Sequence, residues 1–213
     1  MDRVQQNGGT AGFITAICLA LLFIFFASSG LDMQTAMDPA KALPVLGQKA
    51  FNFASIGVLG LLASGFGLVF TVGLFSRLRD KAPTRAAATL GLAFVGLTTH
   101  ALGAALLWKG GAMLAALSAT DQTAAAHGWI ALGAVNEGLM ATGNGFTGAS
   151  VLVAGWAIAG TGVMSAALGW LAIVTGIVEI LQVFSAQMAL MGLGFLLVII
   201  WLVWGGAQLR SRA

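Results

Sequence analysis

The feature that most constrains this chain is a series of six apolar stretches, each about as long as a lipid bilayer is thick. A helix needs about 20 apolar residues to cross roughly 30 Å of hydrocarbon. Only 8% of the residues are charged, whereas about 25% is usual in soluble domains, so lipid must cover most of the surface. We therefore expect one all-α domain over residues 1–213, a polytopic bundle of six transmembrane helices. The expected spans are residues 12–30, 53–75, 87–108, 136–157, 163–184 and 188–208.

Lysine and arginine are divided unequally between the two ends of these spans. With six spans, seven basic residues lie on the side of the termini and three on the other, so the positive-inside rule predicts that both termini are cytoplasmic. Because these charges sit at span ends, we expect a multi-pass protein of the cell membrane with lipid as its partner, and no nucleic-acid binding. The seven are Arg3, Arg77, Arg79, Lys81, Arg85, Arg210 and Arg212, and the three are Lys41, Lys49 and Lys109.

The first span has an alternative interpretation as a cleaved signal peptide. It ends in "FASSG", small residues that suit a signal peptidase, but Arg3 is the one basic residue before it, and signal peptides normally begin with more positive charge. Cleavage would leave five spans and an outside N-terminus.

Two connections on the outer side carry helix-start signals. Asp38 before Pro39 predicts a short interfacial helix within residues 31–52. Thr120 or Asp121 is expected to cap a helix that continues into the fourth span. As a single helix, residues 121–158 would measure about 57 Å, so it either projects from the membrane or begins flat upon it. "GTG" at 160–162 then predicts a tight inner hairpin.

The segment "GNGFTG", residues 143–148, matches the glycine pattern G-x-G-x-x-G. A dinucleotide site would also need a preceding strand, a βαβ unit and a following acidic residue, none of which is present. Small residues let membrane helices approach closely. We therefore predict that this segment is a helix-packing surface.

Polar residues inside the spans indicate where any chemistry would lie. Glu137 and Asn144 share a face of the fourth span, His100 lies in the third, and Glu179 and Gln182 lie in the fifth. Because charges facing lipid are unfavourable, we expect these side chains to face the bundle interior or the water boundary, in the outer third of the membrane. The predicted ligand-binding residues are these five. Alternatively, the two glutamates reach the outer headgroups, and His100 and Asn144 only hydrogen-bond helices together.

No cofactor or metal site is predicted. His100 and His127 are expected at different depths, which disfavours a bis-histidine haem, although haem on His100 remains an alternative. No ligand spacing supports zinc. Cys18 is the one cysteine, so it forms no internal disulfide, and we expect a small buried side chain.

The length, the span spacing, the basic loop "RLRDKAPTR" and the stretch "GASVLVAGWAIAGTGVMSAALGWLAIVTGIVEI" resemble a family of uncharacterised bacterial six-span proteins, domain of unknown function 4386. That family usually has a proline in the late hairpin, where this chain has "GTGVMS". The resemblance implies a bacterial inner-membrane protein with six spans. It implies no activity and no site residues.

Three functions fit these observations. The first is a small-ligand-binding or transport protein with a polar pocket in the outer half of the membrane, where His100 acts as a base or donor and the glutamates bind a cation or relay protons. The second is a structural or accessory subunit, as a homo-oligomer or within a larger membrane complex. The third is a membrane-embedded enzyme that uses the same groups for acid–base chemistry. No nucleophile motif or complete metal motif supports it, so no catalytic residue is predicted.

Overall fold

The computed structural model describes residues 2–31, 33–185 and 188–211, so Arg212 of the basic set lies outside it. The described chain is all-α, as expected, and contains no strand in these ranges. Its helices are α1 (Arg3–Ser29), α2 (Met33–Met37), α3 (Pro39–Gln48), α4 (Ala50–Leu78), α5 (Pro83–Leu117), α6 (Gln122–Thr161), α7 (Ala166–Gln182) and α8 (Met188–Arg210).

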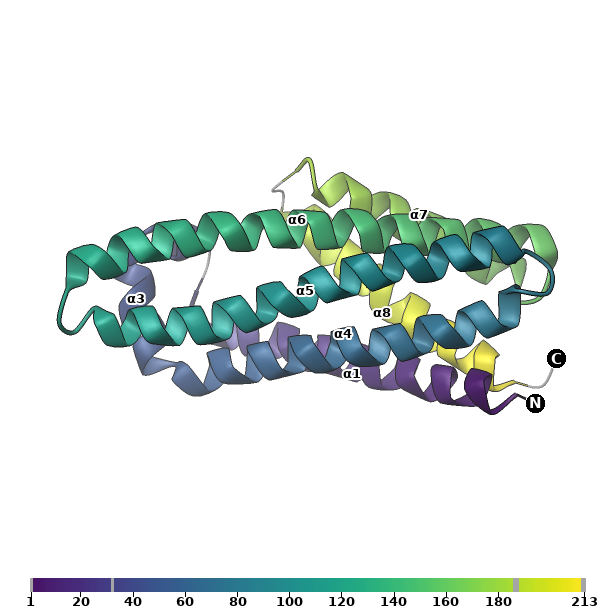
Figure 1. The fold of residues 1–213 in the computed structure, drawn as a ribbon, viewed down its shortest axis with the longest axis horizontal. Coiled ribbons are helices and arrows are strands. Elements are labelled where there is room, and N and C mark those ends of the chain that lie inside the picture. Colours follow the sequence, from purple (N-terminus) through teal and green to yellow (C-terminus); the bar gives the residue numbers. More distant parts are fainter. Residues whose placement is uncertain (1, 32, 186–187, 212–213) are drawn as a thin grey trace.

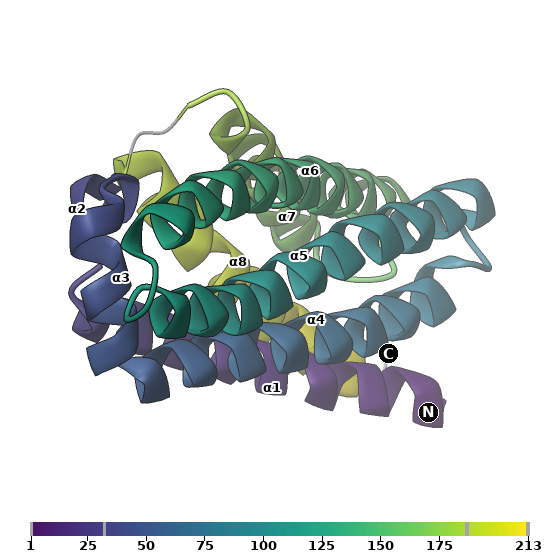
Figure 2. The ribbon, with the colours of Figure 1, turned by 60° about the vertical axis from the view of Figure 1, so that its left-hand side comes forward.

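The six long helices form a closed ring. In order around it, α1 packs on α4, α4 on α5, α5 on α6, α6 on α7, α7 on α8, and α8 back on α1. The short helices α2 and α3 cover one end of the ring (Figure 2). Each of the six predicted spans falls on one of the ring helices, several of which extend further than predicted.

Four helices in the described part are long and apolar enough to cross a membrane: α1, α4, α5 and α8. Helix α7 is apolar but shorter, with 17 residues. Helix α6 has 40 residues and is not among these four. The fold is therefore a helical bundle with four candidate spans, as suits a membrane-embedded protein.

The two ends of the bundle carry different segments of the chain. Both termini lie at one end, together with the α4–α5 loop and the α6–α7 turn (Figure 1). We call this the terminal end, and the opposite one, which carries α3 and the α5–α6 turn, the α3 end.

Helix α6 runs without a break beside α5 and is about 60 Å long. A single helix over this segment is therefore present, while its position relative to the membrane stays a prediction.

The predicted helix boundaries are confirmed at three positions. The Asp38 side chain accepts a hydrogen bond from the backbone N–H of Ala40 and caps α3. The Asp121 carboxylate accepts the N–H of Ala124 at 2.9 Å and caps α6. Gly162 has a φ of +67° at the end of α6, which is the left-handed conformation that favours glycine in a tight turn.

Two separate apolar cores stabilise the two ends. The terminal core joins α1, α4, α5, α6, α7 and α8, and the α3 core joins α3 to α4 and α6. In the α3 core, the Trp129 indole also donates a hydrogen bond to the Ala36 carbonyl at 2.8 Å. The largest fully buried side chains of the terminal core are Leu74, Leu78, Ile158, Leu168 and Leu209.

Polar contacts join several segments at the terminal end. The Arg77 guanidinium donates to the Gln5 side chain on α1 at 3.1 Å and to the Val163 carbonyl in the α6–α7 turn at 3.3 Å. The Ser76 hydroxyl donates to the Asp2 carboxylate at 2.7 Å. This hydrogen bond lowers the pKa of Asp2 from its usual value.

Helices α6 and α7 approach so closely that side chains are excluded between them. A Cβ atom on Gly155 would lie 2.6 Å from the carbonyl oxygen of Gly169, and one on Gly176 would lie 2.5 Å from that of Gly148. Such distances are too short for carbon and oxygen, so glycine is required here for the observed spacing. Close contact of this kind is how membrane helices gain packing energy.

The segment "GNGFTG" is confirmed as a packing surface, although its glycines are not equivalent. Gly143 packs against the His100 ring on α5, and a Cβ on Gly148 would lie 2.8 Å from the Glu179 Cβ on α7. Gly145 has room, because a Cβ there would lie 3.7 Å from Val183. The packing therefore depends on the first and last glycines.

We expect Gly148→Ala to lower the free energy of unfolding by about 1–3 kcal/mol, because the added methyl group overpacks the α6–α7 contact. Gly145→Ala, one turn away, is the matched control and should change stability little. Thermal unfolding of both variants in the same detergent measures the difference. Equal losses from the two variants would show that α6 and α7 are not in this close contact.

Candidate functional site

Polar side chains gather at one level of the ring, between the two apolar cores. Along α6, the α3 core ends at Trp129 and the terminal core begins at Val151. Asn144 lies between them. At this level, His100 on α5, Asn144 on α6, and Glu179 and Gln182 on α7 form what we call the polar belt.

One half of the belt is a hydrogen bond between α5 and α6. The His100 Nε2 lies 2.9 Å from the Asn144 Oδ1. The imidazole reaches this position because residue 143 is glycine, where a Cβ would lie 2.5 Å from the same ring nitrogen. With the amide oxygen as acceptor, the His100 Nε2 carries the proton and the other ring nitrogen is left as an acceptor.

The other half of the belt is a carboxyl–amide pair on α7. The Gln182 Nε2 donates to the Glu179 Oε1 at 3.1 Å. Glu179 is only 7% exposed, and α8 leaves space for its carboxyl group at Gly194, where a Cβ would lie 2.7 Å from Oε1. Within the described residues, Glu179 forms no ion pair. A buried carboxyl group therefore sits among three helices with a neutral partner.

The two halves lie at nearly the same height. Helices α6 and α7 are antiparallel, with Gly148 opposite Glu179 and Gly145 opposite Val183. Asn144 is therefore level with the end of α7, where Gln182 lies. The structure thus brings four of the five predicted residues to one level of the bundle.

Glu137 does not join them. It lies about 10 Å further along α6 than Asn144, towards the α3 end. Because α7 ends opposite Gly145, it does not reach this part of α6, and the Glu137 side chain is exposed. It has no hydrogen bond or ion pair in the part of the chain that the structure describes. Of the two orientations expected for Glu137, its side chain therefore does not take the one towards the bundle interior.

Two buried oxygen atoms in the α5–α6 contact belong to residues outside the predicted five. Thr147 is within one turn of Asn144, and Asn136 lies about 12 Å from Asn144 along α6. The Asn136 Oδ1 and the Thr147 Oγ1 are buried without a hydrogen-bond partner. Both lie in the α5–α6 contact, Thr147 at Gly96 and Asn136 at Gly103, on either side of His100. Buried polar atoms normally have partners, so this contact holds unused acceptors. The glycines at helical spacing around His100 were the available signal for it.

The structure separates the two histidines. His127 is exposed near the start of α6, about 25 Å along that helix from Asn144, so it does not face His100. No group of three or more His, Cys, Asp or Glu side chains that could hold a metal ion occurs among the described residues. Cys18 is buried in α1, as expected.

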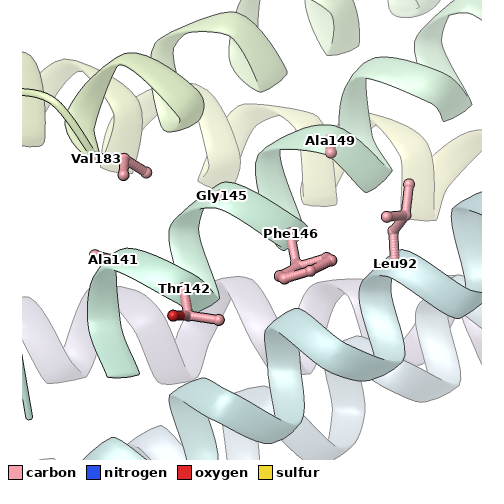
Figure 3. A pocket seen from close by; sticks show the side chains of 7 residues that line it. All are labelled: Leu92, Ala141, Thr142, Gly145, Phe146, Ala149 and Val183. Atoms are coloured by element: carbon pink, nitrogen blue, oxygen red, sulfur yellow. The ribbon is translucent and has the colours of Figure 1, made fainter. Parts of the chain in front are cut away.

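A shallow apolar groove of about 410 Å³ lies on the outer face of α6. Figure 3 shows Phe146 and Leu92 along it, with Val183 from the end of α7 nearby. Its one polar side chain is Thr142. The groove shares no residue with the polar belt and offers little to a polar ligand.

Comparison of the sequence with family models, curated proteins and solved structures found no match. The resemblance to domain of unknown function 4386 therefore stays a prediction. Function must be inferred from the geometry of the polar belt itself.

The His100–Asn144 contact can be measured by a double-mutant cycle. We expect His100→Ala and Asn144→Ala to be coupled by about 0.6 kcal/mol in unfolding free energy, and by no more than about 1.7 kcal/mol, the average and the maximum found for hydrogen bonds between membrane helices. His100→Ala combined with Asn52→Ala is the control, because Asn52 instead donates to Ser28. Additive effects in the first cycle would mean that the hydrogen bond is absent in the membrane.

Proposed function

We propose that this protein is a six-span membrane protein that binds a small polar ligand at the polar belt, together with a proton or small cation, as a ligand-binding or transport protein. The observation that carries the proposal is Glu179, a carboxyl group buried among apolar helices without a positive partner in the described residues. Ionisable groups at membrane depth are unfavourable unless paired, and they mark ion and substrate pathways.

The Glu179 site has the parts that such binding needs. An uncompensated negative charge in an apolar interior is strongly unfavourable, so the carboxyl group takes up a proton or a cation. The Gln182 amide donates to one carboxyl oxygen and holds its orientation. Binding and release of positive charge at Glu179 would then change the polarity of the belt.

His100 and its neighbours supply the groups for a polar ligand. The His100–Asn144 pair lies level with Gln182, and the unpartnered oxygen of Thr147 lies one turn further along α6. Together they offer both hydrogen-bond donors and acceptors to one ligand. Neutral and positively charged polar molecules match this set better than anions, because Glu179 is the one acidic member.

Exposed tryptophans support membrane crossing by α6 and α7. Trp156, Trp170 and Trp204 are exposed on α6, α7 and α8, within four to six residues of the terminal ends of those helices. Tryptophan concentrates at membrane–water boundaries. The three side chains therefore mark one boundary. The 17 residues of α7 measure about 25 Å, nearly the thickness of the hydrocarbon.

This boundary also sets the orientation that we propose. The terminal end carries more basic residues than the α3 end, so the positive-inside rule makes the terminal end cytoplasmic. Glu179 is nine residues beyond Trp170 along α7, about 14 Å from that boundary. Gln182 and Asn144 each lie 12 residues from the tryptophan of their own helix, about 18 Å from the boundary, so the belt spans the middle of the membrane. The α3 end then faces the outside.

The chain's two glutamates give a matched test of the Glu179 site. We expect infrared difference spectra, recorded while pH is changed, to contain a band from a protonated carboxyl group in an apolar setting. Glu179→Gln should remove that band, whereas Glu137→Gln should leave it, because Glu137 is exposed and unpartnered in the described part.

Repeating the titration with sodium or potassium added distinguishes a proton from a cation as the bound charge. A band that disappears on adding salt at constant pH indicates that the cation replaces the proton. Loss of the same band in Glu137→Gln, or spectra unchanged by Glu179→Gln, would contradict the proposal.

A second function, as an accessory subunit or homo-oligomer, is favoured by the end of α5 and the start of α6, on either side of the α5–α6 turn. We call these two segments the projecting part. Large apolar side chains are exposed there, with 73% of Met113, 59% of Ile130 and 56% of Val135 accessible. Exposed apolar patches on a segment beyond the ring are typical of contact surfaces. This function is compatible with the first, since the projection lies apart from the belt.

A further inference from the structure

We propose that a basic cleft at the terminal end binds the phosphate of an anionic lipid headgroup. The cleft has a volume of about 330 Å³. It is lined by the α4–α5 loop from Lys81, by the first residues of α5 as far as Arg85, and by Gly160 and Thr161 at the end of α6. The proposal depends on this end lying at the membrane surface and not on the polar belt.

The charges in the cleft are available to a ligand. Lys81 and Arg85 both line it, and neither forms an ion pair within the described residues. The nearest acid in sequence, Asp80, pairs with Arg79 at 3.7 Å. No acidic side chain lines the cleft. It therefore presents two positive charges without a negative one, as phosphate recognition requires.

The position of Arg85 is fixed by its surroundings. Its guanidinium carbon lies 4.5 Å from the centre of the Trp156 ring. A Cβ on Gly160 would lie only 3.3 Å from the Arg85 Nη1, so glycine at this position leaves room for the guanidinium group. Stacking on tryptophan holds the group while its N–H donors remain free for a phosphate.

The depth of the cleft selects a lipid as the source of the phosphate. Trp156 is 60% exposed, and together with Trp170 and Trp204 it marks the membrane boundary. A guanidinium stacked on Trp156 therefore lies at headgroup level. Anionic headgroups attract clustered basic residues at this level by about 1 kcal/mol for each cation, which is about a fivefold change in affinity.

The test measures thermal unfolding of the whole protein in detergent as phosphatidylglycerol is added, with phosphatidylcholine as the comparison lipid. Phosphatidylglycerol should raise the unfolding temperature more strongly. Lys81→Gln and Arg85→Gln should each lower the apparent affinity about fivefold, while Arg85→Lys should retain most of it. Lys81 is exposed, so its substitution tests the site even if Arg85→Gln fails to fold.

Arg79→Gln is the matched control, because it removes the same charge from the same loop outside the cleft. It should leave the affinity for phosphatidylglycerol unchanged. If Arg79→Gln weakens binding as much as Lys81→Gln does, the attraction is a diffuse surface charge and the proposal is wrong. Inorganic phosphate and glycerol phosphate are also titrated, and stabilisation by either one equal to that of the lipid would overturn the lipid assignment.

Discussion

The close contact between α6 and α7 is the interaction on which the rest of the site depends. Glycines at 148, 155, 169 and 176 allow the two backbones to touch, and larger residues would separate them. This contact sets the height of α7 beside α6, and so brings Glu179 and Gln182 level with Asn144. A segment that resembles a nucleotide-binding loop in sequence is therefore a packing surface that positions the polar belt.

The arrangement of two apolar cores around a polar level bears on the proposed function. Each core stabilises its own end of the ring, so the belt residues need not contribute to folding through burial of apolar surface. Polar groups held in such a setting are positioned by the cores and remain free to exchange partners. This suits the binding and release of a ligand better than a uniformly apolar bundle would.

Much of the fold followed from local patterns. Asp38 and Asp121 act as caps because their short carboxylates reach backbone donors within the first helical turn, which depends on neighbouring residues alone. Likewise, the glycine-rich hairpin at 160–162 turns as expected. His100 and Asn144 were correctly placed together, because an apolar environment leaves few other partners for them.

What the sequence could not provide is the relative height of the helices. Glu137 shares a helical face with Asn144, but it is exposed because α7 ends before reaching it, and that end depends on how α7 sits against α6. Asn136 and Thr147 were left out of the predicted site for the same reason, since their burial comes from the glycines of α5 opposite them. Local periodicity gives the direction of a side chain but not what lies across from it.

The central claim is that α7 lies in the membrane, so that Glu179 is a buried acid at hydrocarbon depth. Spin labels attached to cysteine in a Cys18→Ala background test it most directly, with Val174→Cys on the exposed face of α7 and Thr123→Cys on the projecting part of α6. In lipid bilayers, we predict that the label at 174 collides with oxygen and is shielded from a water-soluble nickel chelate, with the opposite result at 123. A label at 174 that is readily reached by the nickel chelate would place α7 in water and contradict the proposed site.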